Sequence, residues 1–257
     1  MKETYYKIET AYCHYYAVIQ QPYPELHKVI IGAKKKCVVL SIYVNDPDAN
    51  LDALGHSISC NISGNLKRGK GTQHMLKTAL QFAITQYPHI SGKFLFKDAS
   101  SIQCQQDYRL SLAVFSVLNT GKTWYEKNFN AYPSELQEEY QECINNFKAI
   151  LTTKPPLKIK QKQLLTMYNS ASSLQSFIDT LKEYECFLYK GWAESLITRH
   201  IPYLYGIECC IDANALELPK LTIIQESKKP DNLFTMKGGD TNPLLVPKYG
   251  VNDPLLL

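Results

Sequence analysis

A short glycine-rich, basic segment carries the residue types that could bind a phosphate group. It covers residues 66–72, with the sequence Leu-Lys-Arg-Gly-Lys-Gly-Thr, and lies between a strand-like run at 56–62 and a helical pattern that starts near Gln73. Two glycines one residue apart let the backbone pass close to a ligand, and the N–H groups of a helix's first turn favour an anion. We therefore expect a phosphate or pyrophosphate to bind at the residues Arg68, Gly69, Lys70, Gly71 and Thr72, where Arg68 and Lys70 add positive charge.

Two motifs resemble those of the GNAT family of N-acetyltransferases. The glycine turn between a strand and a long helix is similar to the loop that binds the pyrophosphate of acetyl-CoA in that family. Residues 123–129, with the sequence Thr-Trp-Tyr-Glu-Lys-Asn-Phe, resemble the Tyr-Glu-Lys segment that ends the family's last conserved helix. The resemblance covers the region from about Ser57 to Phe129. It implies a GNAT-like fold, acetyl-CoA as the cofactor and an amine as the acceptor.

Three residues are candidates for acid–base chemistry. An enzyme of this class holds an amine beside a thioester, removes a proton from the ammonium group and returns one to the leaving thiolate. The resemblance implies Tyr125 as the acid, and Glu126 and Asp98 are candidates for the base, Asp98 because it follows a predicted central strand. Structural roles compete with two of these assignments, since Tyr125 could pack beside Trp124 and Asp98 could form a turn with residues 99–101.

The spacing of cysteines and histidines argues against other catalytic or metal sites. The eight cysteines form no C-x-x-C pair, and none has a histidine at metal-ligand spacing. We therefore expect that the protein binds no metal. We also expect that most of the cysteines are buried thiols and that the protein is in a reducing compartment. No cysteine stands beside a histidine in a way that favours a nucleophile. His74, one turn into the motif helix, faces either the cofactor or solvent.

The elements that must position these residues follow from apolar periodicity. Strands are expected as an antiparallel meander at residues 5–8, 12–19, 37–44 and 56–62. A helix with Thr72 as its N-cap is expected at 73–87, followed by a short central strand at 93–97. That strand would run parallel to the strand before the helix, joined to it by a crossover connection.

Helical patterns dominate the second half of the chain. They cover residues 108–118, where Gly121 fits a C-terminal cap, then the region from Glu135 to Leu151, and then 164–199. Between the last two, residues 152–162 contain two adjacent prolines and alternating lysines, which is typical of a linker.

The predicted fold class is α+β, with a mixed, mostly antiparallel sheet flanked by helices. We predict a GNAT-like domain at 1–151, a helical extension at 152–218 and an extended, proline-rich tail at 219–257. The tail contains Asn-Pro-Leu-Leu at 242–245 and Asp-Pro-Leu-Leu at 253–256. This near-repeat is either a docking peptide for a protein partner or a chance occurrence.

The composition of the chain limits the kinds of partner and the cellular location that we expect. No run approaches the roughly 20 apolar residues of a membrane span, and the N-terminus does not resemble a signal peptide, so we expect a cytoplasmic protein. The net charge is +4 without one long basic run, so nucleic acid is not indicated as a partner. The high content of asparagine, lysine and tyrosine resembles the composition of proteins from large DNA viruses. This resemblance implies that the protein is located in the cytoplasm of a host cell or in a virion.

Two functional hypotheses follow. The first is an acetyl-CoA-dependent N-acetyltransferase with an unknown acceptor amine. The second is a non-catalytic scaffold, for example a minor virion or capsid component, that keeps an acetyltransferase-like fold and binds a protein partner through the 219–257 tail. The second is motivated by Leu66, where the family has Gln or Arg, and by the missing glycine after Lys127.

Overall fold

The computed structural model describes residues 2–32, 36–55, 70–105, 108–181, 186–189, 191–230 and 233. Contacts divide this part of the chain into two compact units, which we treat separately. Unit 1 contains the described residues of 1–96 and 210–233, and unit 2 contains those of 97–209. These boundaries differ from the predicted ones at 151 and 218. The proline-lysine segment at 152–162 is a loop within unit 2, so the composition break marks a surface connection rather than a boundary between the two units.

Unit 1 is built on an antiparallel meander. Its strands in chain order are β1 (Lys2–Glu9), β2 (His14–Tyr23), β3 (Leu26–Gly32), β4 (Lys36–Tyr43) and β5 (Ala49–Leu54). Each pairs antiparallel with the next. The prediction of an antiparallel meander is therefore confirmed for the strands at 5–8, 12–19 and 37–44, except that β3 lies between the last two. The sequence analysis did not predict β3 and β5. In β5 only Ala49 and Leu51 are buried, so this strand lacks the strong apolar pattern of a core strand.

The sheet of unit 1 becomes mixed at β5. Helix α1 (Gly71–Gln86) follows, and the next strand, β6 (Lys93–Lys97), pairs parallel with β5. Strand β6 has the predicted bounds and orientation, although its described parallel neighbour is β5. The predicted strand at 56–62 lies outside the described residues. The fold class is confirmed as α+β, with a mixed, mostly antiparallel sheet flanked by helices.

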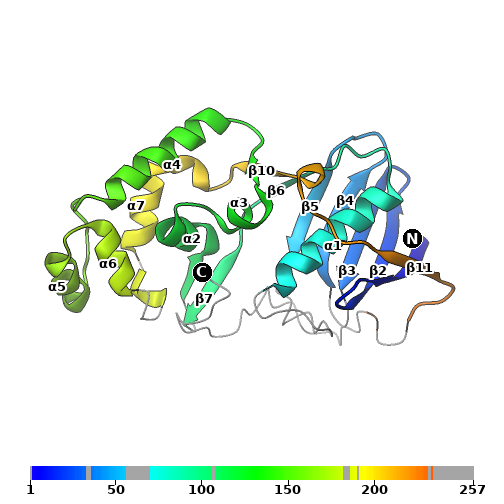
Figure 1. Cartoon of the computed structure of the whole chain (residues 1–257), viewed down its shortest axis with the longest axis horizontal. Coiled ribbons are helices and arrows are strands. Elements are labelled where there is room, and N and C mark those ends of the chain that lie inside the picture. The colour runs from blue at the N-terminus through cyan, green and yellow to red at the C-terminus, as the bar shows by residue number, and fades with distance from the viewer. Residues whose placement is uncertain are drawn as a thin grey trace. The chain divides into compact units, whose positions relative to one another are not determined.

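Helix α1 lies across one face of this sheet (Figure 1). Its apolar face buries Met75, Leu76, Ala79, Leu80, Phe82 and Ala83. The spacing of these residues follows the helical period, so one face of α1 is apolar and covers the strands. Tyr87 caps the C-terminal end, with its N–H donating to the Ala83 carbonyl, before Pro88.

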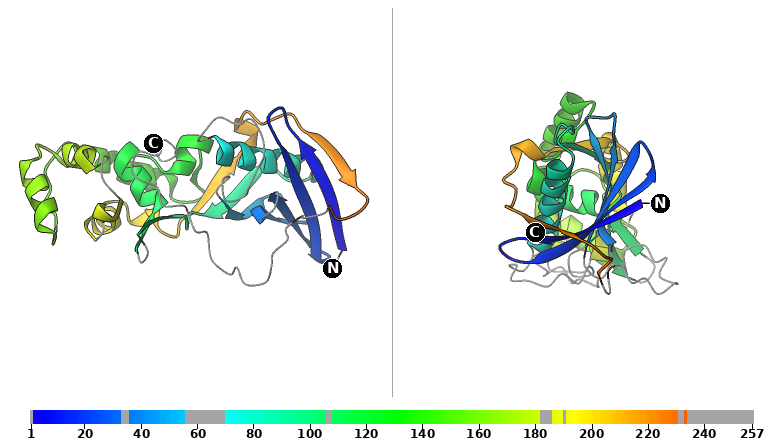
Figure 2. Two further views of the ribbon diagram at one scale, coloured as in Figure 1. Left: turned by 90° about the horizontal axis from the view of Figure 1, so that it is seen from below. Right: turned by 90° about the vertical axis from the view of Figure 1, so that its right-hand side faces the viewer.

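The chain returns to unit 1 near its end. Strand β10 (Glu208–Asp212) is the neighbour of β6, and the 3-10 turn η3 (Ala213–Ala215) follows it. Strand β11 (Thr222–Glu226) then pairs antiparallel with β1, beside which it is visible in Figure 2. Part of the predicted tail is thus a sheet strand. The residues of both tail repeats lie outside the described residues.

Unit 2 begins with a hairpin. Strands β7 (Ser101–Gln105) and β8 (Tyr108–Ser111) pair antiparallel, and helix α2 (Leu112–Thr120) follows directly. The prediction of a helix from Tyr108 is wrong for its first turn, because Tyr108 to Ser111 pair with β7 instead. Ser111 is the N-cap of α2, and Gly121 caps its end with φ of 69°, as predicted.

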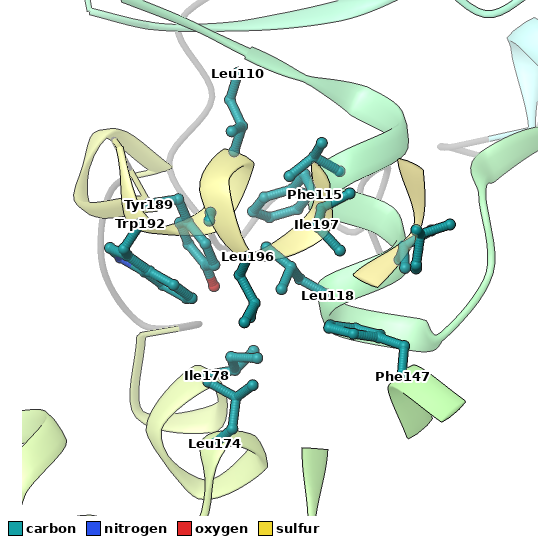
Figure 3. Close-up of a cluster of buried hydrophobic side chains, with 14 of the residues drawn as sticks. Leu110, Phe115, Leu118, Phe147, Leu174, Ile178, Tyr189, Trp192, Leu196 and Ile197 are labelled. Atoms are coloured by element: carbon teal, nitrogen blue, oxygen red, sulfur yellow. The ribbon is translucent and has the colours of Figure 1, made fainter. Parts of the chain in front are cut away.

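The rest of unit 2 is mostly helical. Its remaining elements are α3 (Trp124–Phe129), β9 (Tyr132–Pro133), α4 (Gln137–Leu151), α5 (Lys162–Ser170), α6 (Leu174–Leu181), η1 (Cys186–Tyr189), α7 (Trp192–His200) and η2 (Pro202–Leu204). Leu110, Phe115, Phe147, Ile178 and Trp192 belong to one hydrophobic cluster that joins these elements (Figure 3). No described helix is both long and apolar enough to span a bilayer.

The cysteines of unit 2 correct one expectation. Cys104 on β7 and Cys186 on η1 form a disulfide across a sequence separation of 82 residues. Cys37 of unit 1 is also disulfide-bonded. Of the described thiols, only Cys13 and Cys210 are buried. The expectation of mostly buried thiols is therefore wrong, and cysteine usage no longer supports a reducing compartment, since disulfides persist mainly in oxidising ones.

Candidate functional site

The start of α1 holds the described part of the predicted phosphate site. Arg68 and Gly69 lie outside the described residues. Lys70 is the N-cap of α1, Gly71 is its first residue and Thr72 its second, so the prediction of Thr72 as N-cap is wrong by two positions. The Lys70 side chain makes no capping hydrogen bond, and the first turn of α1 contains no acidic residue. The first turn of α1 thus has positive character that neither the N-cap nor an acidic residue of that turn offsets.

The strands beside α1 share only a short parallel register. Ala49 pairs with Phe94 and Asn50 with Leu95, and the register of β5 with β6 ends there, although β5 continues to Leu54. The connection from β5 to α1 leaves from the carboxyl end of β5. Carboxyl ends of parallel strands are common binding positions in α/β sheets, because the chain turns into helices there.

A polar cluster missed by the sequence analysis lies one turn into α1. His74 Nδ1 is 2.8 Å from the Tyr15 hydroxyl, 3.5 Å from the Thr78 hydroxyl and 3.7 Å from Cys13 Sγ. The Tyr12 ring meets the imidazole edge to face at 5.7 Å. His74 therefore faces strand β2 rather than solvent. The spacing of cysteines and histidines in the sequence could not show the contact between Cys13 and His74, because the fold joins residues 61 positions apart.

Electrostatics favour a neutral imidazole in this cluster. Burial lowers the pKa of His74, and the charge of Lys77 lowers it further. Burial also raises the pKa of Tyr15 well above its usual value. The second ring nitrogen, Nε2, is enclosed and has no hydrogen-bond partner among the described residues. The Tyr15 hydroxyl lies closer to Nδ1 than the Cys13 thiol does, so the main role of His74 is to satisfy a buried tyrosine.

One sequence signal pointed toward this cluster. Tyr15 is the second residue of β2 and Cys13 lies just before this strand, two positions away, and alternate residues of an extended chain share a face. Only the position of α1 over that face brings His74 to them.

Tyr125 and Glu126, two of the predicted catalytic residues, lie on the short helix α3 in unit 2. Glu126 completes a capping box: its Oε2 accepts from the Thr123 N–H at 2.5 Å, and its own N–H donates to the Thr123 hydroxyl at 3.1 Å. The same carboxylate oxygen accepts a hydrogen bond from the Tyr140 hydroxyl at 3.2 Å. This carboxylate is thus held by structural hydrogen bonds.

The Tyr125 side chain is buried against other aromatic rings. Its ring meets Trp124 edge to face at 5.0 Å and lies 6.3 Å from Phe129, and the residue is 7% exposed. Burial raises the pKa of Tyr125 far above its usual value, and the charge of Asp98 raises it further. A raised pKa weakens a phenol as a proton donor, so this geometry agrees with a packing role beside Trp124.

Asp98 follows β6 directly, as predicted, and sits in a turn with Ser100. Its Oδ1 accepts from the Ser100 N–H at 3.0 Å and from the Ser100 hydroxyl. Its Oδ2 is enclosed and lacks a hydrogen-bond partner among the described residues. Burial raises the pKa of Asp98. The charge of Asp98 also raises the pKa of Tyr140, whose hydroxyl donates to Glu126, so the fold places the three predicted catalytic residues in one region around Tyr140.

Within the described residues, no group of three or more His, Cys, Asp or Glu side chains could hold a metal ion. Comparison with protein-family models, with curated proteins and with solved structures finds no match for this chain.

Proposed function

We propose that this chain is an acetyl-CoA-dependent N-acetyltransferase-like protein whose unit 1 binds the pyrophosphate of the CoA thioester. The observation that carries the proposal is the β5-α1-β6 arrangement. It combines a parallel register of two residue pairs with a helix that starts at Gly71 and whose N-cap, Lys70, makes no side-chain capping hydrogen bond. A pyrophosphate placed there would interact with the helix dipole and with the Lys70 ammonium group.

The donor site is tested by titrating the full chain with acetyl-CoA in a calorimeter, alongside thermal unfolding. A charge reversal, Lys70→Glu, should weaken binding about tenfold or more, because it replaces an attraction to the pyrophosphate with a repulsion. Lys93→Glu is the matched control. Lys93 is also an exposed lysine, but it lies at the amino end of β6, whereas the proposed site lies beyond the carboxyl end of β5. Absence of both heat and thermal stabilisation at millimolar acetyl-CoA would refute the proposal, because a ligand of the folded state must raise its stability.

Tyr125, Glu126 and Asp98 stay the candidate catalytic residues of this proposal. Asp98 has the strongest case for the general base, because its raised pKa and enclosed oxygen are features of functional carboxylates. Release of free CoA thiol in the presence of a panel of primary amines measures transfer and separates it from binding.

A second candidate function, a non-catalytic scaffold, is favoured by the contacts of Tyr125 and Glu126. Both side chains are used for packing and helix capping in unit 2. In this case the chain keeps the acetyltransferase-like fold and binds a protein partner through its tail. Acetyl-CoA binding without detectable transfer, in a panel that includes peptide and small amines, is the outcome that separates this function from the first.

A further inference from the structure

A groove of about 470 Å³ opens in unit 2 beside helix α7. One wall is the extended segment at 156–161, and the other is the first two turns of α7. The residues that line it are Pro156, Leu157, Lys158, Ile159, Lys160, Gln161, Leu164, Gly191, Trp192, Ser195, Leu196 and Arg199. Its volume falls within the range of sites that hold small ligands or short peptide segments.

The floor of the groove is apolar. Leu164, Trp192 and Leu196 are buried members of the hydrophobic cluster of unit 2, where Trp192 and Leu196 appear in Figure 3. Leu157 and Ile159 pack against the same cluster and are half-buried. The Trp192 indole N–H is already satisfied by the Leu188 carbonyl at 3.0 Å. This floor therefore offers hydrophobic contact without an unsatisfied donor, which suits aliphatic side chains.

The rim of the groove is positively charged. Lys158, Lys160 and Arg199 line it and are exposed, and none of the described lining residues is acidic. The alternation of the extended segment points Leu157 and Ile159 to the floor and the two lysines to the rim. An occupant that matches both surfaces carries aliphatic side chains next to a carboxylate.

The chain itself contains such a segment. Residues 253–256 read Asp-Pro-Leu-Leu, whereas the related residues 242–245 read Asn-Pro-Leu-Leu and lack the carboxylate. We propose that this groove binds the 253–256 segment, with its leucines on the apolar floor and the Asp253 carboxylate at the rim. A proline has a restricted φ angle, which lowers the entropy lost when such a segment binds. This inference is independent of acetyl-CoA binding.

The two tail repeats provide a matched pair of probes. We would use fluorescent peptides of residues 252–257 (Asn-Asp-Pro-Leu-Leu-Leu) and 241–246 (Thr-Asn-Pro-Leu-Leu-Val), both blocked at each end so that Asp253 carries the only charge. The receptor is the full chain with Leu255→Ser and Leu256→Ser, which weakens competition from its own tail. Fluorescence anisotropy should give a dissociation constant about two- to fivefold lower for the acidic peptide, the range expected for one exposed ion pair. Replacing its leucines with serine should weaken binding more than tenfold.

The groove side is tested by charge reversal in the same receptor. Lys160→Glu should weaken the acidic peptide about fivefold, and a peptide with Asp253→Lys should then recover the lost affinity. Lys122→Glu is the control, because Lys122 is equally exposed in unit 2 but does not line the groove. Near-native circular dichroism of both variants ensures that affinity, and not folding, is compared.

Three outcomes would overturn the proposal. The first is peptide binding that Lys160→Glu and Lys122→Glu change equally, which would place the tail elsewhere. The second is equal affinity for the two repeats. The third is binding of decanoate, an anionic aliphatic chain, without binding of either peptide, which would assign the groove to a lipid.

Discussion

The Tyr15 hydroxyl and the Nδ1 atom of His74 lie 2.8 Å apart and join the start of β2 to the first turns of α1. Tyr15 is completely buried, and the two rings are nearly parallel, with centroids 5.9 Å apart. This hydrogen bond links the first turns of α1 to the sheet through two side chains that are 59 positions apart in the chain. It fixes the helix end at which the acetyl-CoA site is proposed.

Replacing Tyr15 with phenylalanine should destabilise the protein. Tyr15→Phe keeps the ring but leaves His74 without its closest hydrogen-bond partner, which typically costs about 1–2 kcal/mol in the free energy of unfolding. Urea unfolding followed by circular dichroism measures the change. Tyr16→Phe on the same strand is the control, because Tyr16 is only half-buried. A smaller effect for Tyr15→Phe than for Tyr16→Phe would contradict this role of the hydrogen bond.

The free energy of unfolding should fall as the pH drops from about 7 to 5. The unfolded state binds a proton at each histidine near pH 6.5, whereas burial lowers the pKa of His74, His27 and His200 in the folded state. Between pH 7 and 5 the unfolded state therefore binds more protons than the folded state. Protonation stabilises the unfolded state relative to the folded state, so the free energy of unfolding falls. His74→Gln should reduce this slope in urea titrations at several pH values. An unaltered slope in His74→Gln would show that His74 ionises normally.

Asp98→Asn should stabilise the protein at pH 7 and have little effect near pH 3. Burial raises the pKa of Asp98, so the folded state disfavours its ionised form, and stability is lost as pH rises through the unfolded and then the folded pKa. Asparagine cannot ionise, yet its amide oxygen can still accept the Ser100 N–H. Unfolding in urea at the two pH values tests the sign. If Asp98 is also the general base, the same variant should lose acetyl transfer while it still binds acetyl-CoA.

Loss of the Cys104–Cys186 disulfide should destabilise unit 2 by about 2–4 kcal/mol, since it closes a long loop in the unfolded chain. Serine at both positions removes this bond without reducing other cysteines. Thermal unfolding should show a lower transition temperature for the double variant, and Cys143→Ser, which removes a thiol outside the disulfide, serves as the control. Equal transition temperatures for the double variant and the control would mean that the bond does not form in solution.

Much of the fold could be predicted from local patterns. The strand at Lys93–Lys97, the helix after the glycine turn, the glycine cap at Gly121 and the helix that ends at Leu151 all match the structure closely. Each depends on neighbouring residues, through alternation, helical period or a cap. Tyr108 shows the limit of such patterns. The pattern at 108–118 predicted a helix from Tyr108, but the residues from Tyr108 to Ser111 form a strand because they pair with β7.

The candidate site, like the fold, could be predicted only in part. The sequence by itself determined that a basic, glycine-containing segment precedes a helix and that Asp98 follows a short central strand, because both are properties of adjacent residues. Only the tertiary structure decided that His74 meets Tyr15 and Cys13, that Glu126 serves as a helix cap and hydrogen-bond acceptor for Tyr140, and that Leu157 and Trp192 line one groove. These contacts join residues far apart in the chain, and they form because packing the apolar faces of helices and strands fixes which polar side chains become neighbours.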